Sequence, residues 1–388
     1  MSGSQHHEIV VAGGGHAGLF AALALVQAGF EDVVVVDPAG PGALAPTGRS
    51  LALLAGSKAI LERHGVWKLV RDRGHPVWRV DVAGAGAGRV IYDAAEIGVE
   101  ALAWGFVNER LRDGLASAWS RLRGPAGWLT GSVIAMEAGN PRRLVLEEGT
   151  LKADLVIAAD GRNSALRRMA GIGSSRRTYD QAALSFVVEH EHDNRATVLE
   201  RLRPSGPVAT LPLGARRTGI TWVDRRARCE ALGANEGEAL MADLSQLVGD
   251  QLGDMRRVSP IQCYPLGAHH ASRYALPRLA LLGDAAHGVH PIHAQGFNMG
   301  IGDVDVLVAE LAAARARGRA PGGEALRRYE RKRMAANAER LRMTDGLNRL
   351  FSNDLLPLEP ARRAVLGALA SSSWLRRRAI RHGMQVAS

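Results

Sequence analysis

The pattern of apolar and polar positions divides the chain into recognisable elements. Residues 8–12 (EIVVA) and 32–37 (DVVVVD) are short apolar runs, and residues 16–29 between them carry apolar positions at helical spacing. A buried strand, a helix and a second buried strand in this order predict a βαβ unit, which requires a parallel sheet. A later run, 279–283 (LALLG), is expected to add a strand to that sheet, and a long helix is expected over 296–317.

Between these segments the apolar period changes to two, which is typical of antiparallel strands. Residues 76–101 alternate on both sides of a glycine-rich stretch at 84–88. We interpret that stretch as a hairpin loop, because it neither follows a buried strand nor opens a helix. Residues 132–157 alternate as a meander that ends in LVIAA, and 108–121 has a helical pattern. Several strand-like runs over 180–225 predict a separate antiparallel sheet.

A glycine motif occupies the turn between the first strand and the first helix. Gly13, Gly15 and Gly18 form GxGxxG, in which the first glycine allows a tight turn, the second lets a pyrophosphate approach, and the third lets helix and strand pack. The helix N-terminus then offers unpaired N–H groups to phosphate. Asp37 ends the next strand, where it can accept hydrogen bonds from a ribose. A glycine-rich turn without a ligand is the alternative, but strand, helix and acid together favour a bound dinucleotide.

Two further acids follow buried strands. Asp160 comes after LVIAA and Asp284 after LALL, so both are expected at the carboxyl edge of the sheet, where open α/β sheets bind ligands. Gly296 and Asn298 open the following helix, whose N-terminus favours a flavin ring that gains negative charge on reduction. Each acid alone is equally well explained as a helix-capping residue in a loop. Three such sites in this order are better explained by one extended cofactor.

The chain resembles the single-component flavoprotein aromatic hydroxylases (group A flavoprotein monooxygenases), most closely the branch that hydroxylates the ring of ubiquinone precursors. The fingerprints of that family are GxGxxG, a mid-chain Asp-Gly and a later Gly-Asp. The resemblance runs from about residue 8 to residue 370. The segments that carry it are TGRSLALLAGSKAILERHGVW (47–67), YDQAAL (179–184), GPVATLPL (206–213), GDAAHGVHPIHAQGFNMG (283–300) and MTDGLNRLFSND (343–354).

The resemblance implies an FAD-binding, Rossmann-like doubly wound α/β domain with an inserted antiparallel-sheet substrate domain and a helical C-terminal tail. The expected FAD-binding parts are 1–75, 108–178 with the Asp-Gly motif, and 271–323 with the Gly-Asp motif. The remaining divisions are a substrate-domain hairpin at 76–107, the antiparallel substrate domain at 179–270, and a basic helical region at 324–388.

The same resemblance implies roles along the cofactor. Gly13, Gly15 and Gly18 would hold the pyrophosphate of FAD, Asp37 the adenosine ribose, and Arg49 the phosphates. Taken alone, Arg49 would be interpreted as a surface cation.

Further roles are implied nearer the flavin. Asn108 would contact FAD from the start of its helix, Asp160 would serve both FAD and the pyridine nucleotide, and Asp284 would bind the ribityl chain. The isoalloxazine ring would be lined by Gln295, Gly296, Phe297 and Asn298.

Three departures from the family pattern stand out. The family usually has Ala-Gly-Gln-Gly where this chain has His293-Ala294-Gln295-Gly296, and Gly-Ala where it has Ala158-Ala159. It also usually has Arg before the Asp of the following helix, where this chain has Gly302-Asp303. His293 would lie beside the reacting ring, where an imidazole could bind or deprotonate a phenol. His293 and Gln295 are therefore the catalytic candidates, with simple space-filling as the alternative for His293.

The implied reaction needs NAD(P)H to reduce the flavin and O2 to form a flavin C4a-hydroperoxide, which hydroxylates a phenol-type ring, such as that of a polyprenylated quinone precursor. The sequence has no second GxGxxG, in agreement with a transiently bound reductant. Cys229 and Cys263 are too far apart in sequence for a flavin disulfide reductase, and a halogenase Trp-x-Trp motif is absent. A hydroxylase of the same fold acting on a secondary metabolite, and a non-catalytic flavin-binding assembly protein, remain alternatives.

The positive charge is concentrated at the C-terminal end. Residues 311–388 contain 17 Lys and Arg against 6 Asp and Glu, while the rest of the chain is close to neutral. Without a nucleic-acid motif, this favours an anionic membrane surface, a protein partner or a solvated helical face. We expect a cytoplasmic protein, or one peripheral at the inner face of the membrane, without a signal peptide. The apolar residues expected on this basic C-terminal surface are Leu347, Leu350, Phe351, Trp374, Leu375 and Ile380.

Three histidines could suggest a metal site. His287, His290 and His293 are spaced by three, but Pro291 interrupts the segment, so no metal is expected.

Overall fold

The apolar runs near the N-terminus form a parallel sheet, as predicted. In the computed structural model, β1 (Gln5–Ala12) pairs in parallel with β2 (Val33–Asp37) and with β11 (Gly149–Ala158). In turn, β11 pairs in parallel with β19 (Leu279–Leu281), and β2 pairs in parallel with β8 (Trp128–Thr130). The βαβ start and the later strand are therefore confirmed. The structure describes residues 5–42, 44–84, 88–234, 238–352 and 358–386, with the main chain only at residue 293.

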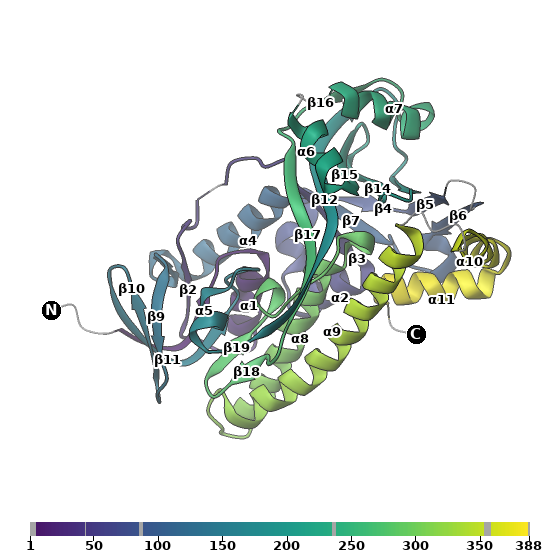
Figure 1. The fold of residues 1–388 in the computed structure, drawn as a ribbon. Helices are drawn as coiled ribbons and strands as arrows, with labels where there is room; N and C mark the ends of the chain where they lie inside the picture. The colour runs from purple at the N-terminus through teal and green to yellow at the C-terminus, as the bar shows by residue number, and fades with distance from the viewer. Residues whose placement is uncertain (1–4, 43, 85–87, 235–237, 353–357, 387–388) are drawn as a thin grey trace.

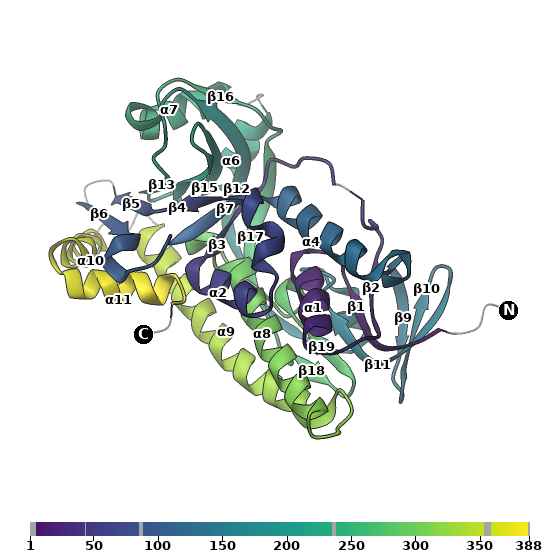
Figure 2. The same cartoon turned by 180° about the vertical axis from the view of Figure 1, so that it is seen from behind.

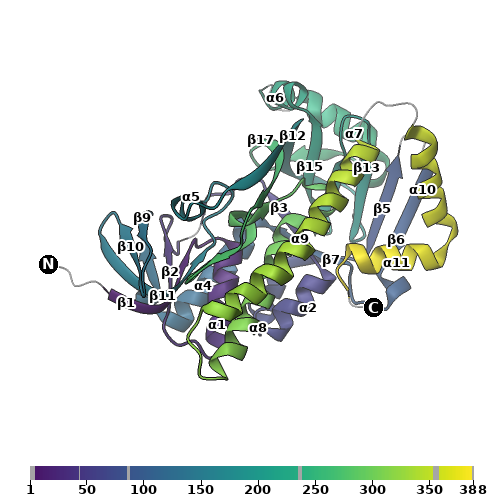
Figure 3. The same ribbon diagram turned by 60° about the horizontal axis from the view of Figure 1, so that its bottom comes forward.

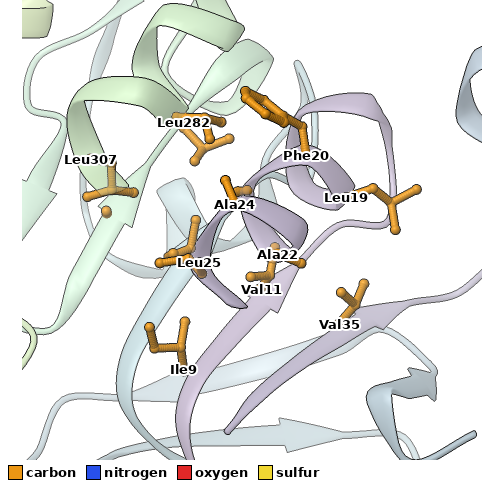
Figure 4. Packing of buried hydrophobic residues seen from close by; sticks show 14 of the residues in the cluster. Ile9, Val11, Leu19, Phe20, Ala22, Ala24, Leu25, Val35, Leu282 and Leu307 are labelled. Atoms are coloured by element: carbon orange, nitrogen blue, oxygen red, sulfur yellow. The ribbon is translucent and has the colours of Figure 1, made fainter. Parts of the chain in front are cut away.

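The helix between the first two strands, α1 (His16–Gln27), is buried along most of its length, which explains why nearly all its residues are apolar. Figure 4 shows Phe20 and Leu25 of α1 on the side of Leu282 and Leu307, and Leu19 on the side of Val35. In the view from behind, α4 (Asn108–Arg123) lies beside α1 (Figure 2). The parallel strands read as continuous apolar runs because this core covers them.

A β-meander completes this sheet. β9 (Val133–Glu137) pairs with β10 (Arg142–Leu146), and β10 pairs antiparallel with β11. The predicted meander over 132–157 is thus confirmed. The side chains of Val133, Leu144 and Leu146 join the same apolar core as α1.

A second, mostly antiparallel sheet lies beside the first (Figure 1). Its longest strand, β12 (Ser174–His190), begins before the expected division at residue 179, and all its partner strands belong to this second sheet. The predicted hairpin around residues 84–88 is confirmed by the antiparallel pairing of Gly84 with Gly88, although residues 85–87 lie outside the described chain. The strands of this second sheet are, in order, β20 (His287–Gly288), β17 (Gln262–Ala271), β12, β15 (Arg217–Arg225), β14 (Val208–Gly214), β13 (Thr197–Leu202), β5 (Arg79–Gly84) and β6 (Gly88–Asp93). In addition, β16 (Met255–Arg257) pairs with β12.

A third, small sheet was not predicted from the apolar pattern; it is formed by β3 (Ser50–Leu54), β7 (Ala103–Val107) and β4 (Gly74–Val77). Its strands are antiparallel, and β7 is the central one. Ala52, Leu53 and Leu54 are consecutive apolar residues that continue into α2 (Ala55–Arg63), so the segment carries no clear period of two.

The C-terminal part is helical, as predicted. The long helix α9 (Gly323–Phe351) packs along α8 (Gln295–Arg315), as Figures 1 and 3 show. α10 (Glu359–Ser371) and α11 (Ser373–Gly383) lie against β6 and the turn after it. No helix in the described part of the chain is long and apolar enough to cross a bilayer.

Four of the apolar residues expected on the basic surface are directed inward, which corrects that expectation. Phe351 is buried with Leu347 and Leu350 packed beside it, in a cluster with strands β5 and β6. Ile380 is buried in a cluster with Leu102. Trp374 and Leu375, by contrast, are exposed on α11. The remaining elements are α3 (Trp67–Val70), α5 (Ala165–Met169), α6 (Arg226–Ala234), α7 (Glu238–Leu252), β18 (Ala275–Leu276) and short 3-10 turns that include Gly283–Ala285 and Ile292–Ala294.

Candidate functional site

The glycine motif forms a tight turn that is closed on two sides and open on the third. Gly13 has a left-handed φ of +116°, and a Cβ there would lie 2.3 Å from the carbonyl oxygen of Ala159. A Cβ at Gly18 would lie 1.9 Å from the carbonyl oxygen of Gly13, so helix α1 can approach β1 only with glycine at this position. A Cβ at Gly15 would meet no described heavy atom within 4 Å. Gly15 is also the N-cap of α1 and has no side-chain cap, so the open side faces unpaired N–H groups suited to phosphate.

Asp37 fixes the same turn from the end of β2. Its Oδ2 accepts a hydrogen bond from the main-chain N–H of Gly14 at 2.6 Å, and its Oδ1 accepts from that of Ala39 at 2.8 Å. A Cβ at Gly14 would lie 2.4 Å from the ring of Trp128, so this glycine, which the motif treats as variable, is required here by packing. The ribose contact expected of Asp37 stays a prediction.

Arg112 is a buried cation at this site that sequence reasoning missed. It lies on α4, is 2% exposed, and donates to the carbonyl oxygens of Gly14, Gly40 and Gly42. Its guanidinium also lies 5.5 Å from the ring centroid of Trp128. The arginine therefore ties the segment after β2 to the glycine turn. Only the helical spacing of α4 could have indicated that Arg112 faces inward.

His16, the residue after the triple glycine, brings three predicted positions together. Its Nε2 donates to the main-chain carbonyl oxygen of Asn108 at 2.8 Å, and its ring makes an edge contact with Phe297 at 5.3 Å. Burial lowers the pKa of His16, although the Asn108 carbonyl favours the protonated ring. The main-chain N–H of Asn108 donates to the carbonyl oxygen of Arg49 at 3.0 Å, and the exposed Arg49 guanidinium stacks over Tyr264 at 5.0 Å.

The Asp-Gly and Gly-Asp motifs are joined at the carboxyl edge of the parallel sheet. Oδ2 of Asp160 accepts from the main-chain N–H of Leu166, while its Oδ1 is buried without a described partner. Arg167, 1% exposed, donates to the carbonyl oxygen of Ala285 at 2.7 Å and so links the two motifs. The side chain of Asp284 is exposed and accepts no hydrogen bond from any described residue. Two carboxylates with free oxygens at one edge fit a ligand rich in hydroxyl groups.

The N-terminus of α8 is fixed by side chains that bond to the protein itself. The amide of Asn298 donates to the carbonyl oxygens of Ala52 (2.8 Å) and Ala294 (2.7 Å), and its oxygen accepts from the N–H of Leu54. Ala294, the N-cap, has an uncommon left-handed φ of +51°, held by this bond. A Cβ at Gly296 would meet no described heavy atom within 4 Å. The helix N-terminus is therefore open, and its main chain, more than the Asn298 side chain, is available to a ring.

Gln295, a catalytic candidate, is buried and directed towards the C-terminal turn. Its Oε1 accepts from Gln385 at 3.0 Å, and its Nε2 donates to the carbonyl oxygen of Gly383 at 3.4 Å. No motif or periodicity in the sequence indicates this link between residues so far apart. The main chain of His293 lies in the turn before α8, but its side chain lies outside the described part of the structure. Its catalytic role stays a prediction.

The histidines expected to be structural have protein partners. Nε2 of His287 lies 2.6 Å from Oδ2 of Asp303, and both side chains are fully buried. Nδ1 of His290 accepts from the main-chain N–H of Ile292 at 3.3 Å, and its ring packs edge-on against Tyr179. Among the described side chains, no group of three or more His, Cys, Asp or Glu is placed to hold a metal ion.

Comparison with known proteins gives a consistent result. Residues 124–344 match the family model of the FAD binding domain. The chain is 35% identical to a ubiquinone hydroxylase, UbiL, of Rhodospirillum rubrum, over 97% of this chain and 89% of the relative. It is 34% identical to the 3-demethoxyubiquinol 3-hydroxylase of Escherichia coli, over 98% of this chain and 99% of the relative.

A solved structure has the same fold. The p-nitrophenol 4-monooxygenase PnpA of Pseudomonas putida superposes with a TM-score of 0.81, covering 98% of each chain at 19% sequence identity. The parallel sheet, the antiparallel sheet and the C-terminal helices thus form an architecture already known among flavin-dependent monooxygenases.

Proposed function

The chain belongs to the FAD-binding monooxygenases of the ubiquinone-hydroxylase family, and from this premise we propose that it hydroxylates the phenol-type ring of a polyprenylated ubiquinone precursor. It is a flavin-dependent aromatic hydroxylase. The names of the two relatives, which share a third of their residues with it over nearly its full length, support the choice of substrate class. Reducing equivalents would come from NADH or NADPH, and the inserted oxygen atom from dioxygen.

The observation that carries the proposal is the set of open groups at one edge of the parallel sheet. Gly15 leaves space at the N-terminus of α1, Asp160 has a buried oxygen without a described partner, and Asp284 presents an exposed carboxylate. Arg167 holds the second and third of these together. An extended dinucleotide such as FAD has a pyrophosphate and several hydroxyl groups in a row, which these groups match chemically.

When bound, FAD supplies the electron transfer and the activation of dioxygen, while the protein supplies binding, orientation and exclusion of water. The N–H groups around Gly15 would bind the pyrophosphate, and the Asp284 carboxylate would accept hydrogen bonds from ribityl hydroxyls. The N-terminus of α8, where Gly296 leaves space, would stabilise negative charge on the ring through the partial positive charge of the helix end.

His293 is proposed to act on the substrate, and Gln295 to position the helix beside it. His293 precedes the α8 N-terminus by two positions and would bind the substrate phenol or remove its proton, which makes the ring more nucleophilic. Gln295 would act by holding the α8 N-terminus in place, because its side chain bonds to the turn at Gly383 and Gln385.

We further propose that α10 and α11 dock on an anionic membrane surface, where a polyprenylated substrate would be found. Trp374 is 59% exposed, Val365 39% and Leu375 37%, although these are large apolar side chains. Arg378 stacks beside Trp374 with its guanidinium 5.5 Å from the ring, so cation and aromatic residue are presented together. A basic helix with exposed aromatic and aliphatic side chains suits the interface of anionic lipid.

The function is tested on the purified protein with a series of polyprenylated and simple phenols. We expect FAD to be released on denaturation, NAD(P)H consumption to rise with the right phenol, and the product to gain one oxygen atom. Release of FAD without any stimulated consumption would indicate a non-catalytic flavoprotein. Hydroxylation restricted to phenols without a prenyl chain would contradict the proposed substrate class and indicate a secondary-metabolite hydroxylase.

A further inference from the structure

A buried carboxylate lies directly behind the Gly283–Asp284 turn. Asp303 of α8 is fully buried and accepts four hydrogen bonds. Its Oδ2 accepts from the main-chain N–H of Gly283 at 3.0 Å and from Nε2 of His287 at 2.6 Å. Its Oδ1 accepts from Nε of Arg333 at 2.7 Å and from Nδ2 of Asn337 at 2.9 Å. One side chain therefore connects the turn that presents Asp284 to helix α9.

The guanidinium of Arg333 occupies the space above Gly302. A Cβ at Gly302 would lie 3.0 to 3.2 Å from Nη2, Cζ and Nη1 of that guanidinium, which is closer than ordinary side-chain contacts. A side chain at residue 302 would therefore require the Arg333 guanidinium to shift by a few tenths of an ångström. Glycine at residue 302 leaves the Arg333 guanidinium free to take the position in which it pairs with Asp303.

Helix α8 also touches the turn itself. A Cβ at Gly300 would lie 3.3 Å from Cα of Gly283, and Gly283 has a left-handed φ of +57°. The turn thus has a main-chain conformation that needs support, and the Asp303 hydrogen bond to its N–H supplies it. Burial alone would raise the pKa of Asp303, but His287 and Arg333 hold that pKa well below its usual range. The carboxylate is therefore charged, as strong acceptance from Gly283 requires.

We propose that Arg333 is a positioning residue for the cofactor: by pairing with Asp303 across the space left by Gly302, it fixes the turn that presents the Asp284 carboxylate. The arginine that pairs with Asp303 belongs to α9, whereas the residue before Asp303 on α8 is a glycine. This inference rests on the proposed role of Asp284 in FAD binding. Removing Arg333 would leave Asp303 buried with one charged partner fewer, and the turn less firmly held.

The test compares two cations on the same helix. Lys332 is adjacent to Arg333 and also pairs with α8, through Glu310 at 2.6 Å, but Glu310 is two helical turns away from Asp303. Apoprotein of Arg333→Met, Lys332→Met and the unaltered chain is titrated with FAD, and binding is followed by quenching of flavin fluorescence. We expect the Kd for FAD to rise about tenfold in Arg333→Met, equivalent to about 1.4 kcal/mol. We expect it to stay within about twofold in Lys332→Met.

Two further variants keep the test decisive. In Arg333→Lys an ammonium group can still reach Asp303. A Kd for FAD between those of the unaltered chain and Arg333→Met supports the positioning role. If Arg333→Met fails to fold, Arg333→Lys takes its place in the comparison. Asp284→Asn tests the underlying assignment separately. If Asp284→Asn weakens FAD binding but neither Arg333 variant does, the present inference is overturned and the proposed function stands. If Asp284→Asn binds FAD as tightly as the unaltered chain, the assignment of Asp284 fails. An equal loss of FAD affinity in Lys332→Met would show that Arg333 acts only through general packing between α8 and α9.

Discussion

Nε2 of His269, on strand β17 of the antiparallel sheet, donates a hydrogen bond of 2.9 Å to the main-chain carbonyl oxygen of Asp284, at the end of the parallel sheet. Because the acceptor is a carbonyl, Nε2 must carry the ring proton. His269 is 5% exposed, and the Gly288 backbone packs against the other side of its ring. The sheet expected to hold the substrate is thus joined by one side chain to the turn expected to hold the flavin.

Replacing His269 tests this connection. His269→Leu should weaken FAD binding by about fivefold, since a hydrogen bond contributes about 1 kcal/mol. His269→Gln, whose amide places an N–H at a similar reach, should bind FAD nearly as well as the unaltered chain. The Kd for FAD, from titration of the apoprotein, checks both variants. Equal affinity in the leucine variant would show that the bond does not support the turn.

Acid should destabilise the fold between about pH 6.5 and 4. Burial lowers the pKa of both His269 and His290 from 6.5 to about 4, so in this window the unfolded chain binds protons that the folded chain does not. The stability that the two neutral imidazoles contribute is therefore fully present above pH 6.5 and is lost as the pH falls towards 4. Protonation at Nδ1 of His290 would also break its bond from the Ile292 N–H.

The variant His290→Asn checks this assignment, because its amide oxygen can accept the same N–H without titrating. Its Tm should fall less than that of the unaltered chain when the pH is lowered through the window. A parallel decline in both proteins would assign the acid sensitivity to other groups.

His293 should matter for turnover and not for cofactor binding. We expect His293→Ala to retain FAD but to lower substrate-stimulated NAD(P)H oxidation at least about tenfold, a barrier change of about 1.4 kcal/mol. The dependence of the rate on pH should also change, because an imidazole titrates near neutrality. Unchanged kinetics between about pH 6 and 9 would leave His293 as a packing residue.

Membrane docking should depend on the exposed apolar residues of α11. The double variant Trp374→Ser, Leu375→Ser should lose flotation with anionic vesicles, and flotation of the unaltered chain should weaken as salt is raised. Ile134, 53% exposed on β9, provides a matched control, and Ile134→Ser should float as before. Equal binding to neutral and anionic vesicles would contradict the charge-based part of this proposal.

The sequence alone predicted those parts of the site in which a motif directly follows a buried strand. The strands before Gly13, Asp160 and Asp284 are continuous apolar runs, and parallel strands necessarily end at the same edge, so the three motifs could be placed together without a structure. The helical tail also followed from composition and period.

The features that were missed depend on contacts between distant residues. Arg112 is a basic residue on a helix rich in arginines, and only the fold shows that it is buried beside Gly14. Gln295 accepts a hydrogen bond from Gln385, which lies 90 residues later in the chain. The inward side of the tail was misjudged for a similar reason, because Ile380 packs against residues near Leu102 that periodicity alone could not identify as its neighbours.

In the proposed reaction this chain uses bound FAD to insert one atom of dioxygen into a phenolic ring. The most direct measurement is a reaction under ¹⁸O₂ with NAD(P)H and a polyprenylated phenol, followed by mass analysis of the product. We expect one labelled oxygen atom on the aromatic ring, and little labelled product from the Asp284→Ala variant, which should lose most of its FAD. NAD(P)H consumption that yields only hydrogen peroxide, or a product oxygen derived from water, would contradict the proposed reaction.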